Sequence, residues 1–148
     1  MDLTRKAKRQ DSKRIWEIRN HPVIRKVSGS SEEFSFDQHD SWFENKYFKD
    51  SNNVCYILES DSIVVGYCRF DFNRENDDYI ISIALDPNYH GKGLGNLLLS
   101  QSLKDFGDGH EILAEVKKEN IVSLGLFQKN DFELFREDEK NYYLKIKY

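Results

Sequence analysis

The chain has 148 residues, is 39% hydrophobic and 14% aromatic, and therefore suits one globular domain, residues 1–148, with a core of its own. Its formal net charge of −4 argues against nucleic-acid binding by bulk charge. No apolar run approaches the roughly 20 residues that cross a bilayer, and the basic N-terminus lacks the apolar segment of a secretory signal, so we expect a cytoplasmic protein without a membrane partner.

The first part of the chain predicts one strand and two helices. Asp11 or Ser12 can cap the first helix, and Asn20-His21-Pro22 ends it, because proline disfavours a helical residue before it. Ser35 or Asp37 can cap the second helix in the same way. We expect a strand over 3–7, a helix from residue 11 or 12 to 19, an irregular serine-rich stretch over 23–36 and a helix over 37–48.

Basic residues crowd the first 26 positions, although the chain as a whole is acidic. They are Arg5, Lys6, Lys8, Arg9, Lys13, Arg14, Arg19, Arg25 and Lys26. Two interpretations fit this run. It is either a solvated helix face, which is the usual outcome, or a set of side chains that meet a phosphate-bearing substrate.

The rest of the chain predicts a sheet and two more helices. Short runs rich in β-branched or aromatic residues indicate strands over 54–58, 63–70, 79–85, 112–116, 132–136 and 142–146. Leucines three and four apart after Gly95 predict a helix that ends near Gly107, and Asn120 can cap a last helix over 121–129. Cys55 and Cys68 lie in predicted strands, where we expect buried free thiols and no metal site.

Three glycines at alternate positions, Gly91, Gly93 and Gly95, separate the strand over 79–85 from the leucine-rich helix. Glycine reaches positive φ without strain, and the N–H groups at a helix N-terminus suit phosphate. The spacing is neither that of a Walker loop, since no Ser or Thr follows Lys92, nor that of a dinucleotide-binding fingerprint. The pattern therefore predicts a pyrophosphate cradle of another kind, and a glycine-rich turn without a ligand is the alternative.

Two motifs of the chain resemble those of the GNAT family of N-acetyltransferases. The run His90-Gly91-Lys92-Gly93-Leu94-Gly95 matches the family's acyl-CoA loop, Arg/Gln-x-x-Gly-x-Gly/Ala, with His90 at the Arg/Gln position. The family motif Asn-x-x-Ala/Ser-x-x-Leu-Tyr-x-x-x-Gly-Phe is matched by Asn120, Ser123, Leu126, Phe127 and Phe132, with Phe127 in place of tyrosine and Asp131 in place of glycine. The order of expected elements is also that of the family, over nearly the whole chain.

The resemblance implies a fold and a cosubstrate. The expected fold is α/β (α+β), with a mixed, mostly antiparallel sheet of about seven strands, splayed at the fourth and fifth, and about four helices on its two faces. Acetyl-CoA is the expected cosubstrate, without a metal. The residues expected to bind it are Ile83, Ala84, Leu85, His90, Gly91, Lys92, Gly93, Leu94, Gly95, Asn120, Ser123 and Phe127.

The chemistry that the resemblance implies is direct attack of a primary amine on the thioester, which needs no enzyme nucleophile and depends mainly on placing the reactants together. Relatives often protonate the leaving thiolate with the tyrosine that Phe127 replaces here. Water, another tyrosine, or release of CoA as thiolate are the alternatives. Tyr79 and Tyr142 are candidate acids, although packing is the commoner role of such residues, and His39 is the candidate base, with His90 as a weaker one.

The acceptor amine is indicated by residues 19–25 and 36–43, which resemble the N-terminal half of nucleotide-amino-sugar N-acetyltransferases of the pseudaminic acid and flagellin glycosylation type. The resemblance implies that Arg19 or Arg25 pairs with a nucleotide diphosphate, that Trp42 stacks on a base or sugar, and that His39 also contacts the substrate, with a UDP-amino sugar as the first candidate. The alternatives are a ribosomal-protein-type N-terminal acetyltransferase, a small-amine acetyltransferase and a non-catalytic acyl-CoA-binding module. A homodimer through the closing strands is also expected.

Overall fold

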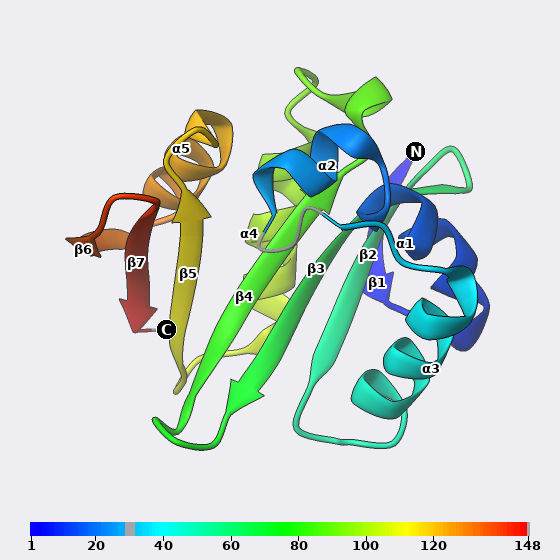
Figure 1. Ribbon diagram of the computed structural model, residues 1–148, viewed down its shortest axis with the longest axis horizontal. Helices are drawn as coiled ribbons and strands as arrows, with labels where there is room; N and C mark the ends of the chain where they lie inside the picture. The colour runs from blue at the N-terminus through cyan, green and yellow to red at the C-terminus, as the bar shows by residue number, and fades with distance from the viewer. Residues whose placement is uncertain (29–31, 148) are drawn as a thin grey trace.

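Figure 1 shows the computed structural model, which describes residues 1–28 and 32–147. The strands are β1 (Asp2–Lys6), β2 (Val54–Ser60), β3 (Ile63–Asn73), β4 (Asp78–Leu85), β5 (Glu111–Lys117), β6 (Glu133–Glu137) and β7 (Asn141–Lys147). The α-helices are α1 (Ser12–Arg19), α2 (Pro22–Val27), α3 (Phe36–Tyr47), α4 (Leu94–Phe106) and α5 (Ile121–Lys129), and two short 3-10 helices are η1 (Arg9–Asp11) and η2 (Pro87–Tyr89).

The seven strands form one sheet in the order β1-β2-β3-β4-β5-β7-β6. All neighbours are antiparallel except β4 and β5, which are parallel, so the predicted mixed sheet is confirmed. The parallel pair is short: it runs from Tyr79 opposite Ile112 to Ile81 opposite Ala114. Beyond this point β4 and β5 diverge, which is clear in Figure 1, and the predicted splay at the fourth and fifth strands is confirmed.

Helices cover both faces of the sheet. The leucines of α4, with Phe127 of α5, pack on one face against residues such as Phe70 and Ile112. On the other face, α1, α2 and α3 pack through a second cluster that includes Ile15 and Phe43. In Figure 1 these three helices lie in front of the sheet and α4 passes behind it. Both cysteines are buried free thiols, as predicted.

One helix lies where the sequence predicted irregular chain. Helix α2 begins at Pro22, within the Asn-His-Pro run that was expected to be a pure break. Proline fits the first turn of a helix, since its missing N–H has no partner there, and His21 caps the helix by accepting from the N–H of Val23 at 3.1 Å. The described residues therefore hold five α-helices rather than about four. The serine-rich prediction also covers residues 29–31, which lie outside the described residues.

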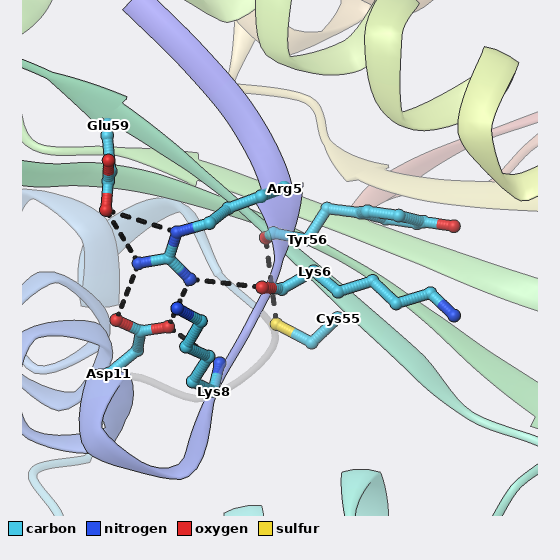
Figure 2. Close-up of polar contacts among 7 residues, drawn as sticks. All are labelled: Arg5, Lys6, Lys8, Asp11, Cys55, Tyr56 and Glu59. Carbon is cyan, nitrogen blue, oxygen red and sulfur yellow. Dashed lines mark hydrogen bonds and ion pairs between the residues drawn. The ribbon is translucent and has the colours of Figure 1, made fainter.

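The start of α1 is fixed to the sheet by Arg5 (Figure 2). The guanidinium of Arg5 donates to both oxygens of Asp11, at 2.8 and 3.1 Å, and to Glu59 of β2 at 2.7 Å. Asp11 also accepts from the N–H of Lys8 at 2.7 Å. Its carboxylate makes no capping hydrogen bond to α1, so the predicted side-chain cap by Asp11 is wrong. Burial raises the pKa of Asp11, but these bonds outweigh burial and hold that pKa below its usual value. Because these bonds fix the start of α1 to the sheet, they also help to set the position of Arg19 at its other end.

Candidate active site

The glycine loop follows β4 and leads into α4. Gly91 and Gly93 have φ values of 78° and 76°, in the left-handed region that favours glycine. A Cβ at either position would meet nothing within 4 Å, so backbone conformation rather than space requires glycine there. Gly93 is the N-cap of α4 and provides no side-chain cap for the helix.

The loop leaves a row of backbone donors free. Within the described part of the chain, the N–H groups of residues 91–96 donate to no other protein group, whereas the N–H of Leu97 already bonds to Gly93. A helix N-terminus with free N–H groups carries a partial positive charge, and an anion can accept several of its hydrogen bonds at once. The loop therefore has the donor set that a pyrophosphate requires.

Two contacts hold this loop to the sheet and to α1. Nε2 of His90 lies 2.8 Å from the carbonyl oxygen of Leu85, the last residue of β4. The carboxylate of Asp86 pairs with Arg14 of α1 and accepts from the N–H of Asn88 at 3.0 Å, which opens η2. Burial raises the pKa of Asp86, but Arg14 and the N–H group outweigh burial and hold it below its usual value.

Helix α5 lies beside the N-terminus of α4. Asn130 donates to Asn96 at 2.9 Å, and a Cβ added to Gly95 would meet the side chain of Leu126 at 3.6 Å. Asn120 caps α5 by accepting from the N–H of Ser123 at 3.2 Å, as the sequence predicted. The predicted cofactor residues of β4, the glycine loop and α5 are thus brought to the end of the sheet at which β4 and β5 diverge (Figure 1).

A pocket of about 370 Å³ lies among α1, α3 and the segment between them. The guanidinium carbon of Arg19 is 4.0 Å from the ring centroid of Phe34 and 4.1 Å from that of Trp42. Phe34 is held in place because its carbonyl accepts from Trp16 at 2.9 Å and its N–H donates to Asn20 at 3.1 Å. The lining residues are Arg19, Glu32, Glu33, Phe34, Gln38, His39 and Trp42.

Comparison with known families decides the identity. The model of the acetyltransferase (GNAT) family matches residues 8–132, well over half of the chain. The chain belongs to the GNAT family. It is therefore an acetyltransferase with acetyl-CoA as its donor, and the predicted enzyme class and cosubstrate are confirmed.

Relatives of this GNAT protein cover most of its length. The L-amino acid N-acyltransferase MnaT of Escherichia coli K12 is 29% identical over 133 residues, which are 85% of this chain and 76% of the relative. Acetyltransferase PseH of Campylobacter jejuni serotype O:2 is 28% identical over 144 residues, 93% of this chain and 87% of the relative. The solved structure of yncA from Salmonella typhimurium with acetyl-CoA has a TM-score of 0.83 at 21% identity, covering 99% of this chain and 94% of that one, and shows the shared fold.

His39 is deeply buried in this GNAT chain, with 1% of its surface exposed. Its ring stacks on Phe43 with centroids 5.8 Å apart, and its Nδ1 lies 3.4 Å from Nη1 of Arg19. Burial first, and then the positive charge of Arg19, lower the pKa of His39 to about 4. The imidazole is therefore neutral near pH 7 and can accept a hydrogen bond from Arg19.

The structure brings Arg19, His39 and Trp42 together but places the other candidates elsewhere. Arg25 caps α1 by donating to the carbonyl of Asn20 at 3.0 Å and contacts Glu33 at the pocket edge. Tyr79 packs on Phe106 at the opposite end of β4 from the glycine loop, about 20 Å away at the usual rise per strand residue.

Tyr142 and Phe127 lie in the C-terminal part of the GNAT fold. Tyr142 is on β7 opposite Val116, with the Lys118 ammonium 5.4 Å from its ring centroid. Phe127 is only 3% exposed and packs edge-on against Phe132, with ring centroids 4.9 Å apart. The ring that replaces the family tyrosine thus belongs to the core around α4 and α5.

Sequence reasoning missed Phe34 and Arg69 as members of this region. Arg69 of β3 lies 5.2 Å from the Trp42 ring centroid and pairs with Asp71. Strand alternation puts residues 67, 69 and 71 on one face of β3, and this signal was available in the sequence.

No group of three or more His, Cys, Asp or Glu residues suited to a metal ion is found in residues 1–28 and 32–147, and none of the helices described is long and apolar enough to span a bilayer.

Proposed function

We propose that this GNAT protein transfers the acetyl group of acetyl-CoA to the primary amine of a nucleotide-linked amino sugar. The donor half of the proposal rests on the N–H groups of residues 91–96, which donate to no protein group among the described residues, in a loop that contains two left-handed glycines and lies beside the β4–β5 splay. These groups hold the pyrophosphate of CoA. Lys92, whose ammonium lies 5.4 Å from the Tyr89 ring centroid, adds positive charge to the same loop.

The splay provides the place for the thioester arm. Residues 82–85 of β4 have no β5 partner, so main-chain groups on that edge are available to pantetheine. The proposed contacts come from Ile83, Ala84 and Leu85, and one N–H of this edge faces the thioester oxygen and stabilises the oxyanion. Asn120, Ser123 and Phe127 position α5 along the other side of the donor.

The reaction joins the amine nitrogen to the acetyl carbon and breaks the carbon–sulfur bond. The attacking amine must first be neutral, and CoA leaves as thiolate or thiol, so one proton is lost and one can be gained. Tyr79 and Tyr142 stay predictions for these proton steps. Tyr79 lies at the far end of β4, which favours water or thiolate release over this tyrosine, whereas Tyr142 pairs with Val116 of β5, beyond the last β4–β5 pair.

The acceptor binds in the pocket lined by Arg19, His39 and Trp42, with Arg25 at its edge. Two observations support a nucleotide-linked amino sugar. Residues 19–25 and 36–43 resemble that branch of the family, and acetyltransferase PseH of Campylobacter jejuni is 28% identical over 93% of the chain. A small amine such as an L-amino acid is the second candidate, because the 29% identical Escherichia coli relative is named as an L-amino acid N-acyltransferase.

The test is a CoA-release assay with acetyl-CoA and five acceptor classes: UDP-linked amino sugars, free amino sugars, L-amino acids, peptides with free N-termini and polyamines. We expect the highest kcat/KM with a UDP-linked amino sugar. Turnover confined to L-amino acids moves the function to the second candidate, and turnover confined to peptides moves it to N-terminal acetylation. Binding of CoA by calorimetry without transfer to any class contradicts the proposal.

A homodimer through β7 and a cytoplasmic location remain predictions. Sedimentation equilibrium of the whole chain measures the first. A monomer at all concentrations used in the assay contradicts the dimer without affecting the proposed reaction.

A further inference from the structure

Arg19 differs from the other arginines in the N-terminal basic run. Each of the other four forms an ion pair, Arg5 with Asp11, Arg9 with Asp40, Arg14 with Asp86 and Arg25 with Glu33. Arg19 has no carboxylate within ion-pair distance in the described part of the chain. Burial first, and then the charge of Arg69, lower the pKa of Arg19, and the more weakly acting Asp71 offsets them only in part.

The rings around Arg19 determine which part of the guanidinium a ligand can reach. The rings of Phe34 and Trp42 cover the guanidinium at 4.0 and 4.1 Å, and both side chains line the same pocket as Arg19. Cation–π contacts satisfy the flat surface of the cation but not its N–H donors, which lie in its plane. The guanidinium of Arg19 can therefore present an edge of coplanar N–H groups to a ligand in the pocket. This arrangement of donors matches the paired oxygens of a carboxylate or phosphate.

One of the N–H donors of Arg19 is used by a hydrogen bond to His39. Its Nδ1 lies 3.4 Å from Nη1 of Arg19, and its ring is fixed between the side chains of α3. A neutral imidazole nitrogen accepts this bond, whereas an imidazolium would repel the guanidinium. The contact orients the guanidinium and leaves its remaining donors for a ligand.

We propose that Arg19 is the anion receptor of the acceptor pocket, binding a carboxylate or phosphate carried by the amine substrate, and that His39 is a positioning residue for Arg19. The inference rests on the proposed function, since it assigns the pocket to the acceptor. It also narrows the range of acceptors, because amines without an anionic group leave the half-buried N–H edge of Arg19 unpaired and are disfavoured.

Binding is tested without turnover by NMR of the arginine Nε–H groups in protein saturated with CoA, so that the glycine loop is filled. The probes are inorganic phosphate and acetate, and Arg19→Gln assigns the Arg19 signal by its loss. We expect a saturable shift of the Arg19 signal, while the signal of Arg9, which is paired with Asp40, does not move. The anion that acts at the lower concentration identifies the group recognised. An Arg19 signal that moves with neither anion overturns the proposal.

Kinetics with matched amines test the substrate preference. One pair is glucosamine 6-phosphate and glucosamine, and another is an L-amino acid and its amide. We expect the wild-type kcat/KM to favour the anionic member of at least one pair by about tenfold or more, mainly through KM. Arg19→Gln removes this preference, Arg19→Lys keeps part of it, and the control Arg9→Gln keeps all of it. A preference that survives in Arg19→Gln overturns the proposal.

The role of His39 is tested by two replacements. In His39→Asn the side-chain oxygen takes the place of Nδ1 and can accept from Arg19, whereas His39→Phe keeps only the ring. A positioning role predicts that His39→Phe raises the KM for anionic amines by a larger factor than it lowers kcat, and that His39→Asn partly restores the KM. A lowered kcat for all amines in both variants, with loss of the acidic limb of the pH profile, would instead make His39 a general base.

Failure of this inference is distinguishable from failure of the proposed function. If UDP-linked amino sugars are the preferred acceptors and Arg19→Gln loses no preference, the function stands and the role of Arg19 is wrong. If the wild type acetylates no amine, the function fails, while the NMR titration still decides whether Arg19 binds anions.

Discussion

Nε2 of His90 lies 2.8 Å from the carbonyl oxygen of Leu85, so the side chain that begins the glycine loop is hydrogen-bonded to the end of β4. A carbonyl oxygen only accepts, which places a proton on this nitrogen. The bond spans the 3-10 turn η2 and fixes the orientation in which the loop leaves the sheet. The family motif has Arg or Gln at this position, and both side chains also carry N–H donors.

Replacing His90 is expected to affect donor binding. In His90→Ala the loop loses one hydrogen bond worth about 1 kcal/mol, so we expect the KM for acetyl-CoA to rise about fivefold. His90→Gln keeps a donor on a side chain of similar reach and should stay near the wild-type value. Steady-state kinetics with acetyl-CoA varied measures both. A normal KM in His90→Ala would mean that the bond does not shape the loop.

Gly93→Ala tests whether the left-handed loop binds the donor, and Gly109→Ala is its matched control. Both glycines have positive φ, 76° and 87°, and a Cβ at either would meet nothing within 4 Å. Each alanine should therefore cost about 1–2 kcal/mol of stability through backbone strain alone. Only Gly93 lies in the donor loop, so we expect a KM for acetyl-CoA about tenfold higher in Gly93→Ala and unchanged in Gly109→Ala. An equal rise in both would assign the effect to general destabilisation.

Gly66 of β3 allows α4 to approach the end of β4. A Cβ there would lie 2.8 Å from Cδ1 of Leu85, 3.0 Å from the carbonyl oxygen of Ala84 and 3.1 Å from Cδ2 of Leu98. We expect Gly66→Ala to lower the free energy of unfolding by about 1–3 kcal/mol through overpacking. A Cβ at Gly125 of α5 would have no neighbouring atom within 4 Å. Gly125→Ala should therefore raise the free energy of unfolding by about 0.5–1 kcal/mol, because alanine favours a helix. Urea denaturation of both variants gives the two signs.

The depressed pKa of His39 predicts a pH dependence of stability. The pKa of His39 is about 4 in the folded chain and 6.5 for an ordinary histidine, so between these pH values the unfolded chain binds a proton that the folded chain does not. Stability therefore falls as the pH drops from 6.5 to 4, by on the order of 3 kcal/mol from this residue. His39→Gln lacks this loss. Urea denaturation at pH 7, 5.5 and 4.5 should show the variant gaining on the wild type as the pH falls, and a constant difference would contradict the assignment.

The sequence by itself determined the features that depend on neighbouring residues. Alternate glycines between a strand and a helix, the Asn120 cap, the hairpins and the order of the elements all follow from φ preference, capping and hydrophobic periodicity. These interactions act over a few residues, and the sequence lists them directly. The left-handed glycine loop before α4 was predictable for this reason, whereas the splay of β4 and β5 was expected from the family resemblance.

Only the tertiary structure decided which distant side chains meet. Arg19 contacts Phe34 and His39 because α1 and α3 pack on the same face of the sheet, and no spacing in the sequence encodes that approach. The same packing separates Tyr79 from the glycine loop and buries Phe127 against Phe132. Charge shows the limit most clearly: five arginines look alike in the sequence, and only the placement of carboxylates in space neutralises four of them and leaves Arg19 facing a pocket.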